Sequence, residues 1–283
     1  MDKPIIILGM HRSGTSLLAE VTNSWGAYGG RLDEFIPADE ANQRGYWEYM
    51  PLVRFNEALL AGEDANWFVP PDSDENLHKA AWDPRFRKAA SNMMAGMENT
   101  GNTWYWKDPR LAILLPFWQQ LWHDAVYIIC LRHPLDIAMS IKKRNNFPVS
   151  ASLLIWQYYI LSILKHTNGH PNVFFVSYED LMDEPEPQCR HLCSFLDRMY
   201  SIQTSPACRL EKMQAIVAPS QTHHRSSESF SASSIATPEQ IDLYAFLDKK
   251  IKQPEERYMT GDFPLYRGWR EYLLTVNALI RVR

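Results

Sequence analysis

The chain has 283 residues, of which 46% are hydrophobic, and a formal net charge of −4. This length and composition indicate a globular chain with a sizeable core and exclude global disorder. The sequence pI of about 6.1 excludes a nucleic-acid-binding protein with a dominant basic face, so any anion site must be a local cluster of basic side chains.

Short apolar runs, taken in chain order, predict the strands of a parallel sheet. They cover residues 5–8, 126–131 and 173–176, and residues 104–106, just before Lys107, are a further candidate. A polar turn and then helical sequence follow these runs, which is typical of right-handed β–α–β crossovers. The sequence therefore predicts an α/β fold of P-loop-like, three-layer form, with helices flanking a central parallel sheet.

Helices are predicted between and after these strands. Pro84 and Pro134 suit the first turn of a helix, because the missing N–H leaves no helical hydrogen bond unmade there. Asp83, directly before Pro84, is a natural N-terminal cap. The predicted helices cover residues 15–24, 51–61, 84–97, 111–121, 134–144, 149–166, 186–196, 238–252 and 270–280.

We expect one domain over residues 1–283, with irregular insertions near residues 62–83 and 219–238. The second insertion is rich in serine and contains His223-His224-Arg225. We favour a mobile surface loop for it, and a lid over the cleft is the alternative. The paired histidines have no further ligands at metal-binding spacing, so no metal site is predicted.

The tripeptide Asp-Pro-Arg occurs twice, at residues 83–85 and 108–110. The residues around the two copies do not match. We therefore interpret the recurrence as coincidence and not as an internal repeat.

The four cysteines are predicted to be buried free thiols, because none of them forms a Cys-x-x-Cys pair; they are Cys130, Cys189, Cys193 and Cys208. Free thiols are typical of a reducing compartment. The N-terminus carries no basic segment with a long apolar run, and no eighteen-residue apolar stretch occurs. We therefore expect a cytoplasmic protein without a transmembrane helix.

The first strand runs directly into a loop bounded by two glycines. Gly9 and Gly14 enclose four residues, as in the phosphate-binding loop Gly-x-x-x-x-Gly-Lys-[Ser/Thr], but Thr15 stands where that loop has lysine. The positive charge is instead inside the loop, at Arg12. Converging backbone N–H groups, the helix dipole and a guanidinium all suit a phosphate or sulfate, and Thr15 and Ser16 add hydroxyl donors. An ordinary strand–turn–helix junction with an exposed arginine is the alternative.

A second basic residue follows the strand at residues 126–131. Arg132 lies at the carboxyl end of that strand, where ligands of parallel sheets bind. Ser140 lies two helical turns further along. Together they suit a second, separate phosphate, and the alternative is a solvated edge arginine with a helix serine.

These motifs resemble those of the sulfotransferase superfamily, which uses 3′-phosphoadenosine 5′-phosphosulfate (PAPS). The likeness is to bacterial-type members, and is closer to tyrosylprotein and carbohydrate members than to cytosolic small-molecule members. Residues 12–16 are similar to the 5′-phosphosulfate loop, and Arg132 with Ser140 matches the 3′-phosphate pair. Lys107, in Lys-Asp-Pro, resembles the lysine that reaches the transferring sulfuryl group. The matched motifs extend from residue 5 to about residue 196.

The resemblance implies sulfuryl transfer to a hydroxyl acceptor, with PAP as product and no metal. Sulfuryl transfer is expected to be in-line through a loose transition state, whose charge Arg12 and Lys107 would stabilise. Tyr178, in a Tyr-Glu-Asp segment, would lie near the adenine, and Arg267 is faintly like a residue that closes on the 3′-phosphate. The implied nucleotide contacts are His11, Arg12, Ser13, Gly14, Thr15, Ser16, Arg132, Ser140, Tyr178 and Arg267.

Two departures from the family pattern affect the chemistry. Leu17 replaces a tryptophan that stacks on adenine, and Pro109 replaces the histidine that serves as general base. The base must therefore be another residue, and the candidates downstream of the loop are Asp33, Glu34, Asp39, Glu40 and Glu48.

Likeness to the tyrosylprotein members favours Asp33 or Glu34 as the base. Glu48 lies among aromatic residues that would desolvate it and raise its pKa. We prefer Glu48, with Glu34 second. For each candidate, a surface carboxylate is the alternative.

Two other functions are compatible with the sequence. A P-loop kinase or NTPase is disfavoured by Thr15 and by a strand that ends in Leu-Arg and not in an acidic residue. A non-catalytic nucleotide-binding protein of the same fold is not excluded by the fold, although the presence of Arg12 and Lys107 speaks against it. The 10 tryptophans and 13 tyrosines favour a carbohydrate or glycolipid acceptor, and core packing explains most of them. The expected partners are the nucleotide and the acceptor, with no nucleic acid.

Overall fold

A computed structural model describes residues 3–40, 42–122, 124–202, 204–217 and 230–252. Its sheet has four parallel strands in the order β2-β1-β3-β4. The strands are β1 (Ile5–Leu8), β2 (Tyr105–Lys107), β3 (Val126–Leu131) and β4 (Val173–Ser177). The predicted α/β fold with a central parallel sheet is confirmed. Strand β2 begins one residue later than predicted, so that Lys107 is its last residue and pairs with Ile7.

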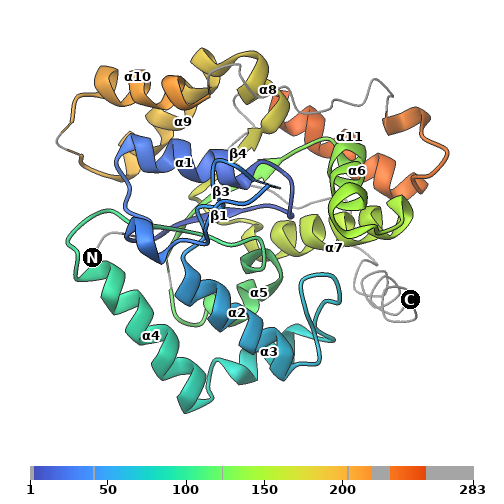
Figure 1. The fold of residues 1–283 in the computed structure, drawn as a ribbon, viewed down its shortest axis with the longest axis horizontal. Helices are drawn as coiled ribbons and strands as arrows, with labels where there is room; N and C mark the ends of the chain where they lie inside the picture. The colour runs from blue at the N-terminus through green and yellow to red at the C-terminus, as the bar shows by residue number, and fades with distance from the viewer. Residues whose placement is uncertain (1–2, 41, 123, 203, 218–229, 253–283) are drawn as a thin grey trace.

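Helices cover both faces of the sheet, as Figure 1 shows. Ile5 and Ile7 pack toward α1 (Thr15–Trp25), α9 (Pro185–Met199) and α10 (Pro206–Ile216). Ile6 and Leu8 alternate to the other face, where α5 (Leu111–Trp118) and α7 (Val149–Thr167) lie. Every residue of β1 is fully buried, as expected for a strand covered on both faces.

The remaining helices extend these two layers. In Figure 1, α2 (Met50–Gly62), α3 (Asp74–Ala80) and α4 (Pro84–Glu98) lie on the same side of the sheet as α5, away from α1. Helices α6 (Pro134–Asn145) and α11 (Pro238–Lys252) pack beside α7, and α11 also contacts β4. A short helix, α8 (Tyr178–Asp183), follows β4 directly. Two 3₁₀ turns, η1 (Leu32–Glu34) and η2 (Phe230–Ala232), complete the described elements.

Three helices were not predicted, and each begins at a serine cap. Ser73, Ser177 and Ser205 accept backbone N–H bonds at the starts of α3, α8 and α10. The prediction of an irregular insertion over residues 62–83 is therefore wrong for residues 74–80, where the Ser73 cap and acidic first-turn residues start a helix. The predicted helix at 111–121 ends earlier, at Trp118.

Parts of the second insertion and of the C-terminal region lie outside the described residues. They include His223-His224-Arg225, Arg267 and the predicted helix at 270–280. The described part of the 219–238 insertion holds η2 and then leads to Pro238, the first residue of α11.

The aromatic residues serve mainly the core. Most of the tryptophans that prompted a carbohydrate acceptor are buried: Trp25, Trp104, Trp106, Trp118, Trp122 and Trp156. Core packing therefore accounts for them. The four cysteines are free thiols, three of them buried. Within the described residues, no helix is both long enough and apolar enough to span a membrane.

Candidate functional site

Close packing and hydrogen bonds within the loop after β1 fix its conformation. A β-carbon on Gly9 would lie 2.7 Å from Ser13 Oγ and 2.9 Å from the Cys130 carbonyl oxygen, so only glycine fits there. The backbone N–H and the hydroxyl of Ser13 both donate to the Met10 carbonyl, at 3.1 and 2.7 Å. Cys130 Sγ donates to the Ser13 carbonyl at 3.1 Å. The Ser13 hydroxyl therefore holds the loop in shape.

Gly14 ends the loop and caps α1. Its φ is 97°, and a β-carbon there would lie 2.2 Å from Tyr178 Cδ2, so both the backbone conformation and the packing require glycine. Thr15 is buried at the first position of α1. The first turn of α1 carries no acidic residue, which leaves the positive end of the helix dipole available to an anion.

The residues predicted to bind the two phosphates lie next to each other. Arg12 Nε donates to Ser140 Oγ at 2.8 Å, and Arg132 Nη1 donates to the Arg12 carbonyl at 3.0 Å. The Arg132 guanidinium also lies 4.6 Å from the centre of the Tyr178 ring. Burial lowers the pKa of Arg12, and the nearby guanidinium of Arg144 lowers it further. A bound anion would offset this crowding of positive charge.

Lys107 connects the loop to an acidic residue. Its Nζ donates to Glu48 Oε1 at 2.7 Å and to Ser16 Oγ at 3.2 Å, and its side chain is 1% exposed. Ser16 Oγ also accepts from Asn42 Nδ2 at 3.3 Å. An ammonium has three donors, and the described residues use two of them. One donor of Lys107 is therefore left for an oxygen of a ligand.

Glu48 lies just before α2 and is buried. Its Oε2 is 4.0 Å from Arg110 Nη1 and accepts no hydrogen bond from a described residue. Burial raises the pKa of Glu48, whereas the positive charges of Lys107 and Arg110 oppose that rise. A desolvated carboxylate with a free oxygen, beside a lysine, is suited to accept a proton.

The other carboxylate candidates lie elsewhere. Glu34 Oε2 accepts the backbone N–H of Arg31 at 2.8 Å and thereby caps its own 3₁₀ turn. Asp33 pairs with Arg31 at the surface, Asp39 accepts the Tyr46 hydroxyl, and Glu40 is exposed. Among the described residues, Glu48 is the candidate that forms an ion pair with Lys107.

His11 is a buried residue of the loop. Its ring lies 4.9 Å from that of Trp67 and 6.0 Å from that of Tyr159, between ring centres. Burial, reinforced by the positive charges of Arg110 and other nearby cations, lowers its pKa well below the usual value. Its buried Nε2 has no hydrogen-bond partner among the described residues.

A buried polar network behind Lys107 was missed by sequence reasoning. Arg110 Nη1 pairs with Asp108 Oδ1 at 2.9 Å, and Asn56 Nδ2 donates to Asp108 Oδ2 at 2.9 Å. Trp118 Nε1 in turn donates to Asn56 Oδ1 at 2.9 Å. Asp108 and Arg110 could have been suspected from their closeness to Lys107. The position of Asn56 on α2 carries no such signal.

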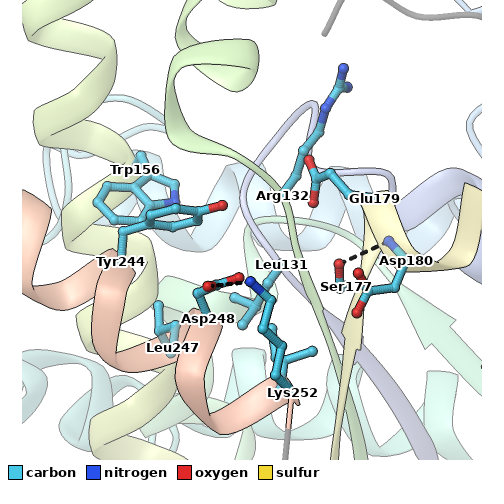
Figure 2. Close-up of a pocket in the computed structure, with 11 residues that line it drawn as sticks. Leu131, Arg132, Trp156, Ser177, Glu179, Asp180, Tyr244, Leu247, Asp248 and Lys252 are labelled. Carbon is cyan, nitrogen blue, oxygen red and sulfur yellow. Dashed lines mark hydrogen bonds and ion pairs between the residues drawn. The ribbon is translucent and has the colours of Figure 1, made fainter. Parts of the chain in front are cut away.

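Figure 2 shows a separate cavity of about 220 Å³ at the carboxyl ends of β3 and β4, next to α11. Trp156, Tyr244 and the Asp248–Lys252 ion pair line it, and Arg132 borders it with its guanidinium turned away from that pair. Lys107, Glu48 and Arg12 are not among its lining residues. The described residues also hold no group of three or more His, Cys, Asp or Glu side chains suited to a metal ion.

Comparison with known families identifies the chain. The model of the Sulfotransferase family matches residues 4–201, which is more than half of the chain. The chain belongs to the sulfotransferase family. A model of the Sulfotransferase domain also matches this family member, over residues 150–262.

Individual relatives of this sulfotransferase-family chain are distant. A putative protein-tyrosine sulfotransferase from Caenorhabditis briggsae is 29% identical over 105 residues, covering 34% of this chain and 38% of that protein. The sulfotransferase domain of the Synechococcus PCC 7002 olefin synthase is 18% identical with a TM-score of 0.48, over 99% of this chain and 96% of that one. The sulfotransferase domain from the curacin biosynthetic pathway is 16% identical with a TM-score of 0.42, over 99% and 98%.

Proposed function

We propose that the protein transfers the sulfuryl group of PAPS to a hydroxyl acceptor and releases PAP. The observation that carries the proposal is the position of Lys107, which bonds both to Ser16 in the first turn of α1 and to Glu48. One ammonium thus lies between the expected donor and the expected base. Membership of the family, whose name is that of the activity, supports the same conclusion.

The nucleotide would bind along the carboxyl ends of β1 and β3. The loop residues His11, Arg12, Ser13, Gly14, Thr15 and Ser16 would take the 5′-phosphosulfate. Arg132 and Ser140 would take the 3′-phosphate, and Tyr178 would lie near the adenine. The Arg132 guanidinium bonds to the Arg12 carbonyl. Burial lowers the pKa of Arg12, and the charge of Arg132 lowers it further. Two interacting cations next to the N-terminus of α1 support this assignment, because both features favour an anion. Arg267 lies outside the described residues and stays a prediction.

In the proposed reaction, the acceptor oxygen attacks sulfur as the bond from sulfur to the 5′-phosphate oxygen breaks. The electron pair of that bond leaves with the phosphate, and the acceptor proton passes to Glu48 Oε2. Arg12 and Lys107 stabilise the charge on the sulfuryl and leaving oxygens, each by about 2.7–4 kcal/mol if they act as oxyanion donors do elsewhere. Because a protonated Glu48 is neutral, the charge of Lys107 is then free to act on the leaving group.

For the acceptor we propose a carbohydrate or glycolipid hydroxyl. Two half-buried tryptophans support this choice: Trp47 directly precedes Glu48, and Trp67 contacts His11. A tyrosine hydroxyl is the second candidate, because the nematode relative is described as a putative protein-tyrosine sulfotransferase.

Ligand-induced stabilisation tests the nucleotide first. PAP at 100 times its Kd should raise the free energy of unfolding by about 2.7 kcal/mol, and ATP with Mg²⁺ should have little effect. Stabilisation by ATP with Mg²⁺ but not by PAP would instead support a kinase or NTPase. Transfer of ³⁵S from PAPS to a panel of glycans, glycolipids, phenols and tyrosine peptides then tests the reaction, with Lys107→Met as the inactive control.

A further inference from the structure

The turn after β2 fixes an arginine beneath the candidate site. Asp108 Oδ1 accepts the backbone N–H of Arg110 at 3.0 Å and pairs with its guanidinium at 2.9 Å. Asp108 is fully buried and the Arg110 side chain is 11% exposed. A second carboxylate, Glu57 on α2, accepts Arg110 Nη2 at 2.8 Å. The guanidinium is therefore held from two sides.

The core in turn holds Asp108. Its second oxygen accepts from Asn56, whose own oxygen accepts from the Trp118 indole. Asn56 and Trp118 are fully buried on α2 and α5. Because both oxygens of Asp108 are occupied, Arg110 has little freedom to move away from its place.

Arg110 faces the free oxygen of Glu48. Lys107 holds Oε1 of that carboxylate at 2.7 Å, whereas Arg110 Nη1 lies 4.0 Å from Oε2. A separation of 4.0 Å is too long for a hydrogen bond but short enough for a strong charge interaction. The positive charge of Arg110 thus attracts Glu48 Oε2, while the lone pairs of that oxygen stay available to accept a proton.

We propose that Arg110 is a positioning residue for the base: fixed by Asp108 and Asn56, it orients Glu48 Oε2 toward the acceptor hydroxyl without occupying that oxygen. This inference rests on the proposed function, in which Glu48 accepts the acceptor proton. It concerns a residue that never touches the reacting atoms, and it accounts for a buried network that the transfer reaction alone does not require.

The charges around Glu48 determine the sign of the expected pH effect. Lys107 on β2 and Arg110 lower its pKa, while Asp108 raises it. Tyr159 on α7 also interacts with Glu48 electrostatically. Removing the charge of Arg110 takes away one cation and leaves Asp108 uncompensated, so the pKa of Glu48 should rise. Because the base must be ionised to act, the acid limb of turnover should move to higher pH.

The test compares Arg110→Gln with Arg85→Gln, which removes an exposed arginine from the same Asp-Pro-Arg tripeptide. In Arg110→Gln we expect the acid limb of the kcat–pH profile to move up by about one unit, a tenfold change in proton affinity. The Kd for PAP should stay within about twofold, since the nucleotide contacts are unchanged. Arg85→Gln should leave both quantities at the wild-type value. An unmoved acid limb in Arg110→Gln, with only a lower melting temperature, would overturn the proposal.

Two further measurements keep the test decisive. If Arg110→Gln does not fold, Arg110→Lys replaces it: the retained charge should leave the acid limb in place, and the lost fork should lower kcat at least threefold. A wild-type kcat in that variant would overturn the proposal. If the wild-type protein transfers no sulfuryl group, the proposed function fails. ¹³C NMR titration of Glu48, assigned with Glu48→Gln, still reports whether Arg110→Gln or Arg110→Lys changes the pKa of that carboxyl, and an unchanged pKa in Arg110→Gln would contradict the coupling.

Discussion

Asp83–Arg85 and Asp108–Arg110 are the same tripeptide folded into the same turn, one at the surface and one beneath the candidate site. In each turn the aspartate accepts the backbone N–H of the arginine two residues later, at 2.8 and 3.0 Å. In each the guanidinium pairs with the same carboxylate at 2.9 Å. The arginine side chain is 87% exposed in the first copy and 11% exposed in the second.

The difference shows what the local sequence determines and what it leaves to the surroundings. Both copies form the same local hydrogen bond and ion pair beside the start of a helix, with Asp83 capping α4 and Arg110 directly preceding α5, and no larger repeat accompanies them. At the surface, water screens the ion pair, and such pairs contribute little. In the buried copy, Asp108 also accepts a hydrogen bond from Asn56, and Arg110 bonds to Glu57. The charge of Arg110 there acts on the Glu48 carboxylate, whose Oε2 accepts no hydrogen bond from a described residue.

The largest expected effect on turnover comes from removing the carboxylate of Glu48, which lies next to the buried Asp108–Arg110 turn. Glu48→Gln keeps the shape but removes the proposed base, so kcat should fall by about 10²–10⁴-fold. The Kd for PAP should not change. Steady-state kinetics and PAP titration measure the two quantities, and Glu40→Gln, at an exposed carboxylate downstream of the same loop, is the matched control. A loss of less than about threefold in Glu48→Gln would remove Glu48 from the mechanism.

The two turns should also differ in their contribution to stability. Asp108→Asn leaves Arg110 without its buried counter-charge, and the free energy of unfolding should fall by about 3–5 kcal/mol. Asp83→Asn should have little effect, because asparagine also caps a helix well and the ion pair there is solvated. Urea unfolding of both variants gives the comparison. Equal losses would mean that burial does not distinguish the turns.

Sequence reasoning succeeds where chemistry and local structure coincide. The loop at residues 9–16 is recognisable because glycines, a strand and a helix start occur together, and Lys107 is recognisable from its motif. The contact of Lys107 with Glu48 follows instead from the position of the segment before α2 relative to β2. Asn56 is a polar residue on a helix face that any sequence scale would expect to be solvated. Only the packing of α2 on α5 explains its burial.

A smaller effect is expected on the nucleotide side, at Arg132, whose guanidinium bonds to the Arg12 carbonyl and lies over the Tyr178 ring. Among the described residues, Arg132 has no carboxylate within ion-pair distance. Arg132→Gln should therefore weaken PAP binding by about 10–100-fold, the range for one charge-assisted contact, and leave kcat at saturating PAPS within about threefold. Calorimetric titration with PAP measures the first quantity. Arg198→Gln, on the exposed side of α9, is the control, and unchanged PAP binding in Arg132→Gln would refute the assignment.

The smallest effect is expected at Glu34, a half-buried residue whose carboxylate, like that of Asp83, bonds within its own turn. Its carboxylate bonds to the backbone of Arg31 within one turn. Glu34→Gln should change kcat by less than about twofold, because the carboxamide oxygen can still accept that bond. If Glu34→Gln abolished turnover and Glu48→Gln did not, the roles of the two carboxylates would have to be exchanged.

Gly14 and Tyr178 are packed directly against each other, although they lie far apart in the sequence. The tyrosine ring occupies the place that any side chain at position 14 would need. The two positions are therefore physically coupled: a side chain at Gly14 is penalised by the backbone angle there and again by the tyrosine ring. If position 14 alone is randomised, selection for folded protein should recover glycine. Other residues at position 14 should be accepted only together with a smaller residue at position 178.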